Sequence, residues 1–151
     1  MKYHDIKDCD FSNGPGVRVT IFVAGCNHGC KGCYNESTWN PNSGIEFTND
    51  TLNTILEALQ DRDGLSLSGG DPMHPRNRKE ILRIIKAVRN KYPEKDIWMW
   101  TGYKFEEVKH TEIVKLIDVV IDGRYEQDNP TTKPWRGSDN QELIEVKFIT
   151  A

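Results

Sequence analysis

Three cysteines within a short stretch are the part of this chain with the clearest capacity for chemistry. Cys26, Cys30 and Cys33 stand in the segment CNHGCKGC, with the spacing C-x3-C-x2-C. A structural zinc site or a closed iron–sulfur cluster takes four protein ligands, and a disulfide framework takes an even number of cysteines. Three clustered thiolates therefore predict a metal centre with one position left open, which is a property of catalytic sites.

A structural zinc site is the alternative interpretation. Its fourth ligand would be His28, which lies between the cysteines, or Cys9, far upstream of them. Zinc ribbons and knuckles usually bring two separated pairs of ligands, and the sequence offers no second pair. A closed ferredoxin-like cluster would need the same Cys9. The spacing favours a [4Fe–4S] cluster with three cysteine ligands and one open iron, and leaves Cys9 as an incidental thiol.

The elements that must position these cysteines alternate between strand and helix patterns. A helix is predicted after Thr48, a second after Asn77, with Glu80 completing a capping box, and a weaker one over 105–117. This alternation is typical of βαβ units and a mainly parallel sheet. The predicted strands are 17–24, 65–68, 97–100, 119–121 and 143–149.

Each of the first four strands is followed by an unusual stretch: the cysteines, SGGDP, WTGY and IDGR. Ligands of parallel α/β folds bind beyond the carboxyl ends of the strands, so the four stretches predict one shared site. A complete eight-stranded barrel needs about 250 residues. We therefore expect residues 1–151 to form a single α/β domain, an open and partial β/α barrel.

The stretch Ser68–Pro72 is either a simple turn or a ligand-binding loop. Its glycines would let the backbone approach a ligand, and its carbonyls together with the Asp71 carboxylate suit a cationic amino group. It is not a phosphate-binding loop, because the lysine of that motif is missing. Trp98 and Trp100 stand at alternate positions and should share one face of a strand, whereas His74 and His110 give no signal beyond surface residues.

Composition excludes several classes of function. Lysine and arginine total 20 against 23 acidic residues, a net charge of −3 without a basic stripe, which disfavours nucleic-acid binding. The longest apolar run is only strand-length, so no membrane span is expected. Four cysteines without an apolar leader predict a cytoplasmic protein whose thiols bind metal rather than form disulfides.

Several motifs, in order along the chain, carry a more specific resemblance. The cysteine spacing resembles the signature of the radical S-adenosylmethionine (SAM) superfamily. Six further stretches, spanning Asn13 to Gln141, resemble its branch of glycyl-radical activases: NGPGVR, CKGCYN, SGGDP, WTGY, IDGRY and WRGSDNQ. There are departures, since Gly32 stands where many members carry an aromatic residue, Tyr34 follows the third cysteine instead, and the glycine motif ends in Asp71 rather than glutamate.

The resemblance implies a radical SAM activase with one [4Fe–4S] cluster on the three cysteines and SAM at its open iron. The reduced cluster would split SAM into methionine and a 5′-deoxyadenosyl radical. The implied partners are the large subunit of an anaerobic ribonucleoside-triphosphate reductase, whose glycine would receive the radical, and a reductant such as flavodoxin. The implied SAM-site residues are Gly32, Tyr34, Ser68, Gly69, Gly70, Asp71, Trp100, Thr101 and Asp122, and the implied partner contacts are Trp135 and Arg136.

Two other functions stay open at this point. One is an activase for a different glycyl-radical enzyme, of the formate lyase type. The other is a small zinc-binding interaction module, which would be colourless, whereas an iron–sulfur protein would be brown and bleached by oxygen.

Overall fold

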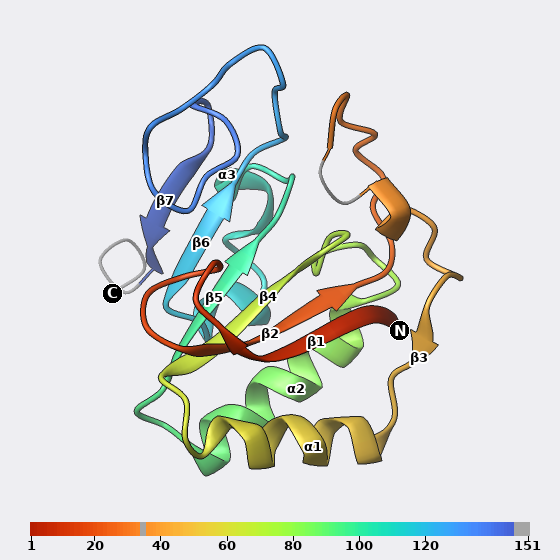
Figure 1. Ribbon diagram of the computed structural model, residues 1–151, viewed down its shortest axis with the longest axis vertical. Helices are drawn as coiled ribbons and strands as arrows, with labels where there is room; N and C mark the ends of the chain where they lie inside the picture. The colour runs from red at the N-terminus through yellow and green to blue at the C-terminus, as the bar shows by residue number, and fades with distance from the viewer. Residues whose placement is uncertain (34–35, 147–151) are drawn as a thin grey trace.

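The computed structural model describes residues 1–33 and 36–146, and its centre is an open seven-stranded sheet (Figure 1). The strand order is β3-β1-β2-β4-β5-β6-β7, so β3 and β7 form the two edges. The four strands in the middle are parallel, and the other three pair antiparallel. The strands are β1 (Lys2–Asp10), β2 (Arg18–Val23), β3 (Ile45–Glu46), β4 (Gly64–Gly69), β5 (Asp96–Trp100), β6 (Val119–Asp122) and β7 (Glu142–Glu145).

The prediction of a mainly parallel sheet holds for its centre and is wrong for its margins. The sequence did not predict β1 or β3. β1 carries several charged and exposed side chains, and it forms because it pairs with β2 on one side and β3 on the other. Such pairing depends on neighbours distant in sequence rather than on local pattern. The last predicted strand begins as expected, but its residues 147–149 lie outside the described residues.

The two long helices cover one face of the sheet (Figure 1). Helix α1 (Asn49–Leu59) begins as predicted, with the Thr48 hydroxyl accepting a hydrogen bond from the backbone N–H of Thr51. Helix α2 (Arg78–Lys91) also begins where predicted, but the capping box at Asn77 is wrong. The Asn77 amide instead donates to the backbone carbonyls of Ala24 and Asp71, so it links two loops rather than capping a helix.

The predicted helix over 105–117 is two short helices, α3 (Phe105–Val108) and α4 (Glu112–Lys115). Thr111 adopts an extended backbone between them, and its hydroxyl accepts a hydrogen bond from the backbone N–H of Val114. A threonine that caps a new helix start favours this break over a continuous helix. A 3-10 turn, η1 (Glu36–Thr38), follows the cysteine-rich segment.

Alternation along the strands gives the sheet two different faces. Val19, Ile21 and Val23 of β2 point toward the helices and are fully buried, as are the equivalent positions of β4 and β5. The opposite face carries polar and aromatic side chains, including Arg18, Ser66, Trp98 and Trp100. Trp98 and Trp100 share that face as predicted, with ring centroids 5.9 Å apart.

The helix-side core is completed by one apolar face of each long helix. The buried residues of these faces are Leu52, Ile55 and Leu59 of α1 and Ile81, Ile84, Ile85 and Val88 of α2. Burying these side chains against the sheet leaves the other sheet face available for a site.

Candidate functional site

A pocket of about 400 Å³ lies at the carboxyl ends of the parallel strands and extends over the polar face of the sheet to residues 12–13. Clefts that bind small molecules have volumes of about 300–1,000 Å³. The pocket lining comes from five segments: residues 12–13, 26–33, 68–71, 100–102 and 123–141. The predicted convergence of the stretches after four strands on one edge of the sheet is therefore confirmed.

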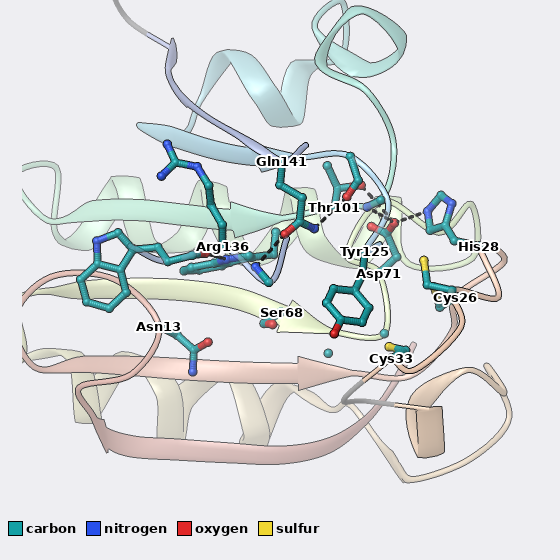
Figure 2. Close-up of a pocket in the computed structure, with 18 of the residues that line it drawn as sticks. Asn13, Cys26, His28, Cys33, Ser68, Asp71, Thr101, Tyr125, Arg136 and Gln141 are labelled. Atoms are coloured by element: carbon teal, nitrogen blue, oxygen red, sulfur yellow. Dashed lines mark hydrogen bonds and ion pairs between the residues drawn. The ribbon is translucent and has the colours of Figure 1, made fainter. Parts of the chain in front are cut away.

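The segment 25–33, here called the cysteine loop, brings all three clustered cysteines to this pocket (Figure 2 labels two of them). The loop is anchored where it leaves β2: the backbone N–H of Gly25 donates to Thr38 at 2.6 Å, and that of Cys26 donates to Trp39 at 3.0 Å. Gly29 and Gly32 have positive φ angles of 61° and 74°, which let the loop turn back twice within a short length.

The chemistry of the donor set fits a metal cluster. None of the four cysteines, all in the described part of the chain, forms a disulfide, and those of the cysteine loop are partly exposed to the pocket. Burial, together with the nearby Asp71 carboxylate and the other two thiols, raises the pKa of Cys26 to about 11, against a hydrogen bond from the backbone N–H of His28 that lowers it. A metal would replace the proton of such a thiol, because the thiolate is the ligating form.

The thiols share the pocket without being gathered into a ready-made metal site. Within residues 1–33 and 36–146, no three His, Cys, Asp or Glu side chains have that arrangement. Cys9 lies exposed on β1 and is not among the residues that line the pocket. His28, the other proposed zinc ligand, directs its Nε2 atom at the Asp71 carboxylate, 2.6 Å away.

The two glycines at the end of β4, Gly69 and Gly70, have a structural role that the sequence did not reveal. A Cβ atom on Gly70 would lie 2.6 Å from the carbonyl oxygen of Val23 and 2.7 Å from that of Gly25. Gly69 has a φ of 127°, and a Cβ there would lie 2.3 Å from the backbone nitrogen of Val23. Both positions must therefore lack a side chain for this segment to pack closely on the end of β2, whether or not a ligand is present.

Asp71 is buried, and its carboxylate accepts hydrogen bonds from four groups of the chain. Its Oδ2 atom accepts hydrogen bonds from His28, from the Thr101 hydroxyl at 3.0 Å and from the Gly102 N–H at 3.0 Å. Its Oδ1 atom accepts one from the Met73 N–H at 2.9 Å. Figure 2 shows the carboxylate between Thr101 and His28. The carboxylate joins three loops at the edge of the pocket.

The other end of the pocket is formed by the segment before β2 and by residues 123–141, here called the strap, which connects β6 to β7. Trp100 extends from β5 toward the strap, and its indole N–H donates to the Trp135 carbonyl at 2.8 Å. Trp135 has a φ of 65°, a conformation that non-glycine residues rarely adopt. Arg136 follows it, and Asn13 faces it from the other side of the pocket (Figure 2).

Some residues expected at the site are not in the pocket lining. Asp122 accepts hydrogen bonds from the Phe105 and Glu142 N–H groups, so its carboxylate ties β6 to α3 and β7. Gly32 contacts the strap instead, since a Cβ there would meet the Gln127 side chain at 2.5 Å. Tyr34 lies outside the described residues.

Two side chains of the pocket lining were missed in the sequence, and one histidine outside the lining was misjudged. Tyr125 and Gln141 reach into the pocket from the strap (Figure 2), and the motifs IDGRY and WRGSDNQ were the only signals for them. His74 was expected at the surface, but it is buried, with its Nε2 atom 3.2 Å from the Asn27 Oδ1 atom. Burial lowers the pKa of His74, although the neighbouring Asp71 charge raises it. His110 is exposed, as expected.

Comparison with known proteins agrees with this site. The model of a family described as a 4Fe-4S single cluster domain matches residues 12–144. The chain is 54% identical to the anaerobic ribonucleoside-triphosphate reductase-activating protein of Enterobacteria phage T4, over 95% of this chain and 93% of that protein. It is 48% identical to the protein of that name from Escherichia coli K12, over 93% and 96%, and 44% identical to that from Haemophilus influenzae, over 98% and 100%.

The chain belongs to the family of anaerobic ribonucleoside-triphosphate reductase-activating proteins. The matching 4Fe-4S domain includes the whole cysteine loop, the segment after β4 and the whole strap. This agrees with the donor chemistry of the pocket and favours an iron–sulfur cluster over a zinc module. Among residues 1–33 and 36–146, no helix has the length and apolar character needed to cross a bilayer.

Proposed function

We propose that this chain activates an anaerobic ribonucleoside-triphosphate reductase by generating a glycyl radical on it, as a radical SAM enzyme. One observation carries the proposal. Three clustered thiols and the glycine loop after β4 line a single pocket, in a chain 54% identical to a protein named for that activation. The proposed fold is accordingly a partial barrel of the radical SAM type, supported by the open sheet, its parallel centre and the position of the pocket.

The three thiolates of the cysteine loop would hold the [4Fe–4S] cluster and leave one iron for SAM. Bound there and reduced by an external donor such as flavodoxin, the cluster would supply the electron for reductive cleavage of SAM, the chemistry that would lead to the glycyl radical on the reductase. The chain's own contribution is to bind, orient and shield the reactants.

The residues next to the thiols would form the SAM site. The segment Ser68–Asp71 borders the cysteine loop, so its backbone is the proposed contact for the methionine end of SAM. Trp100 and Thr101, at the end of β5, would line the pocket beside it. Gly32, Tyr34 and Asp122 remain predicted contacts, although Asp122 would have to give up backbone partners to reach a ribose.

The reductase would enter at the end of the pocket away from the cysteines. Arg136 supports this proposal, because its Nε atom is buried without a hydrogen-bond partner among the residues the structure describes. Its Nη1 atom donates to the Pro134 carbonyl, which fixes the guanidinium at the strap. The strap would have to shift for this buried donor to meet a backbone carbonyl of an incoming protein segment, and Trp135 would supply an aromatic contact.

Cysteine variants test the proposal, with Cys9 as the matched control. Cys26→Ala, Cys30→Ala and Cys33→Ala should each abolish assembly of an oxygen-sensitive [4Fe–4S] cluster, measured by iron and sulfide content after anaerobic reconstitution. They should also abolish conversion of SAM to methionine and 5′-deoxyadenosine under a strong reductant. Cys9→Ala should keep both. Loss of the cluster in the Cys9 variant would contradict the three-ligand arrangement, and zinc without iron in the wild-type protein would contradict the function.

A further inference from the structure

His28 joins the cysteine loop to the ends of β4 and β5. Its Nε2 atom lies 2.6 Å from the Asp71 Oδ2 atom, although the two residues are 43 positions apart in sequence. The His28 side chain is only 5% exposed and that of Asp71 only 2%. A buried hydrogen bond of this length, with a carboxylate as acceptor, is among the stronger kinds of polar contact in proteins.

The His28 ring also occupies a fitted space. It packs edge-on against Tyr103, with ring centroids 4.8 Å apart. It lies so close to Gly102 that a Cβ atom there would be 2.4 Å from the imidazole Cδ2 atom. The Arg78 guanidinium lies over the Tyr103 ring, 5.4 Å from the ring centroid. The His28 ring is therefore held by packing contacts with Tyr103 and Gly102 as well as by its hydrogen bond.

A second link runs in the opposite direction between the same two loops. His74, from the segment after β4, contacts Asn27 of the cysteine loop at 3.2 Å. The Arg76 N–H donates to the Nδ1 atom of His74, so the Nε2 atom of that ring carries the proton and donates to Asn27. The backbone N–H of Asp71 donates to the Gly25 carbonyl at 2.6 Å. The cysteine loop and the segment after β4 are thus joined by side chains contributed from each of them, and by a backbone hydrogen bond.

We propose that His28 is a positioning residue, which holds the cysteine loop against the ends of β4 and β5 through Asp71 so that its thiols face the SAM site. This inference rests on the proposed function. It also assigns Asp71 a different task from the one the sequence indicated. Four donors already occupy its carboxylate, so it holds His28 and Thr101 in place, and the amino group of SAM meets the backbone of the loop instead of this side chain.

The first test uses the protein without a cluster. Hydrogen–deuterium exchange of the backbone amides of residues 25–33 should be faster in His28→Ala than in the wild type, and unchanged in the control His110→Ala, whose histidine is exposed. Gly102→Ala should reproduce the effect, because its new methyl group displaces the ring without altering either hydrogen-bonding residue. Faster exchange throughout the chain would overturn the inference, since it would mean a general loss of stability.

The second test uses the reconstituted protein. Loss of a residue that orients metal ligands costs on the order of 10- to 100-fold in metal affinity. The half-life of the cluster in excess chelator should shorten by that order in His28→Ala and recover in part in His28→Gln, whose amide can still donate to Asp71. The double variant His28→Ala/Asp71→Asn should lose no more than the worse single variant, because the two residues act through one contact.

The two proposals fail in distinguishable ways. A wild-type half-life in His28→Ala, or additive losses in the double variant, would overturn the positioning role while leaving the proposed function intact. A wild-type protein that assembles no cluster would defeat the proposed function and the positioning role that rests on it, even if exchange in the cluster-free protein still showed the His28 link.

Discussion

The side chain of Arg18, at the start of β2, crosses β4 on the polar face of the sheet. It forms an ion pair at 2.8 Å with Asp96, at the start of β5. The guanidinium is completely buried. It also donates to the Ser66 hydroxyl at 2.7 Å and to the Leu65 carbonyl at 2.9 Å, and it lies 5.7 Å from the Trp98 ring centroid. One side chain therefore joins three adjacent parallel strands near their amino ends.

Arg18→Met should destabilise the protein strongly, because it removes the partner of Asp96 and leaves the Ser66 and Leu65 acceptors without their donor. Each buried acceptor left without its donor costs about 1–3 kcal/mol. Asp96 adds less than a fully buried charge would, because its side chain is 39% exposed and can be hydrated in part. Urea unfolding of the cluster-free protein measures the loss. The matched control is Arg83→Met, which breaks the more exposed Arg83–Glu80 pair and should cost about 0–1 kcal/mol. Similar small losses in both variants would contradict this role of Arg18.

Gly70→Ala should destabilise the protein even without a ligand. Its methyl group would lie within 2.7 Å of two backbone carbonyls, and overpacking of this kind costs about 1–3 kcal/mol. The free energy of unfolding of the cluster-free protein is the measurement. Gly29→Ala is the control: no atom lies within 4 Å of its Cβ position, so it reports only the cost of a positive φ. A Gly70→Ala protein as stable as the wild type would contradict the inference that close packing on the end of β2 excludes a side chain at this position.

Asp10 should make the protein sensitive to acid. Burial raises its pKa, but hydrogen bonds from Thr20, Asn13 and the Ser12 N–H outweigh burial and hold the pKa below its ordinary value of 3.8. A lowered pKa in the folded state means that the stabilisation is complete above 3.8 and is lost as the pH falls through the lowered value. Asp10→Asn removes this contribution, so its stability should fall less between pH 6 and about pH 3 than that of the wild type.

The control for Asp10 is Asp8→Asn, an exposed carboxylate on the same strand. The free energy of unfolding of Asp8→Asn, measured by urea titration at each pH, should fall toward low pH as much as that of the wild type. If Asp10→Asn kept the full acid sensitivity of the wild type, the hydrogen bonds around Asp10 would not be the source of the lowered pKa.

The outline of the site was predictable from sequence, because strand periodicity and the stretches after the strands are local signals. The cysteine loop and the segment Ser68–Pro72 were expected at one sheet edge, and they meet there. The helix start at Thr48 was predictable for the same reason. Each of these features is encoded within a few neighbouring residues.

The contacts that hold the site together were not predictable, because they join residues far apart in the chain. Nothing near His28 indicates that it meets Asp71, and a histidine between cysteines looks equally like a metal ligand. Asn77 has the sequence pattern of a helix cap, but two carbonyls from other segments compete successfully for its amide. β1 lacks a strand pattern of its own and depends on β2 and β3 for its pairing.

Arg136→Ala should depress transfer of the radical to the reductase more than it depresses basal cleavage of SAM. The physical reason is its place at the end of the pocket away from the thiols, where we propose that the reductase enters. Both rates should be measured on the same preparation, with and without reductase. Arg124→Ala, an exposed arginine of the same strap, is the control and should leave the ratio unchanged. Equal losses in both assays would instead assign Arg136 to the SAM site.

The most direct test of the central claim is the electron paramagnetic resonance spectrum of an anaerobic mixture of this protein, SAM, a strong reductant and the reductase. The account predicts a glycyl radical on the reductase with the wild type and with Cys9→Ala, and none with Cys26→Ala, Cys30→Ala or Cys33→Ala. No glycyl radical from a wild-type protein that carries its cluster, or an equal radical yield from the Cys26, Cys30 and Cys33 variants, would contradict it.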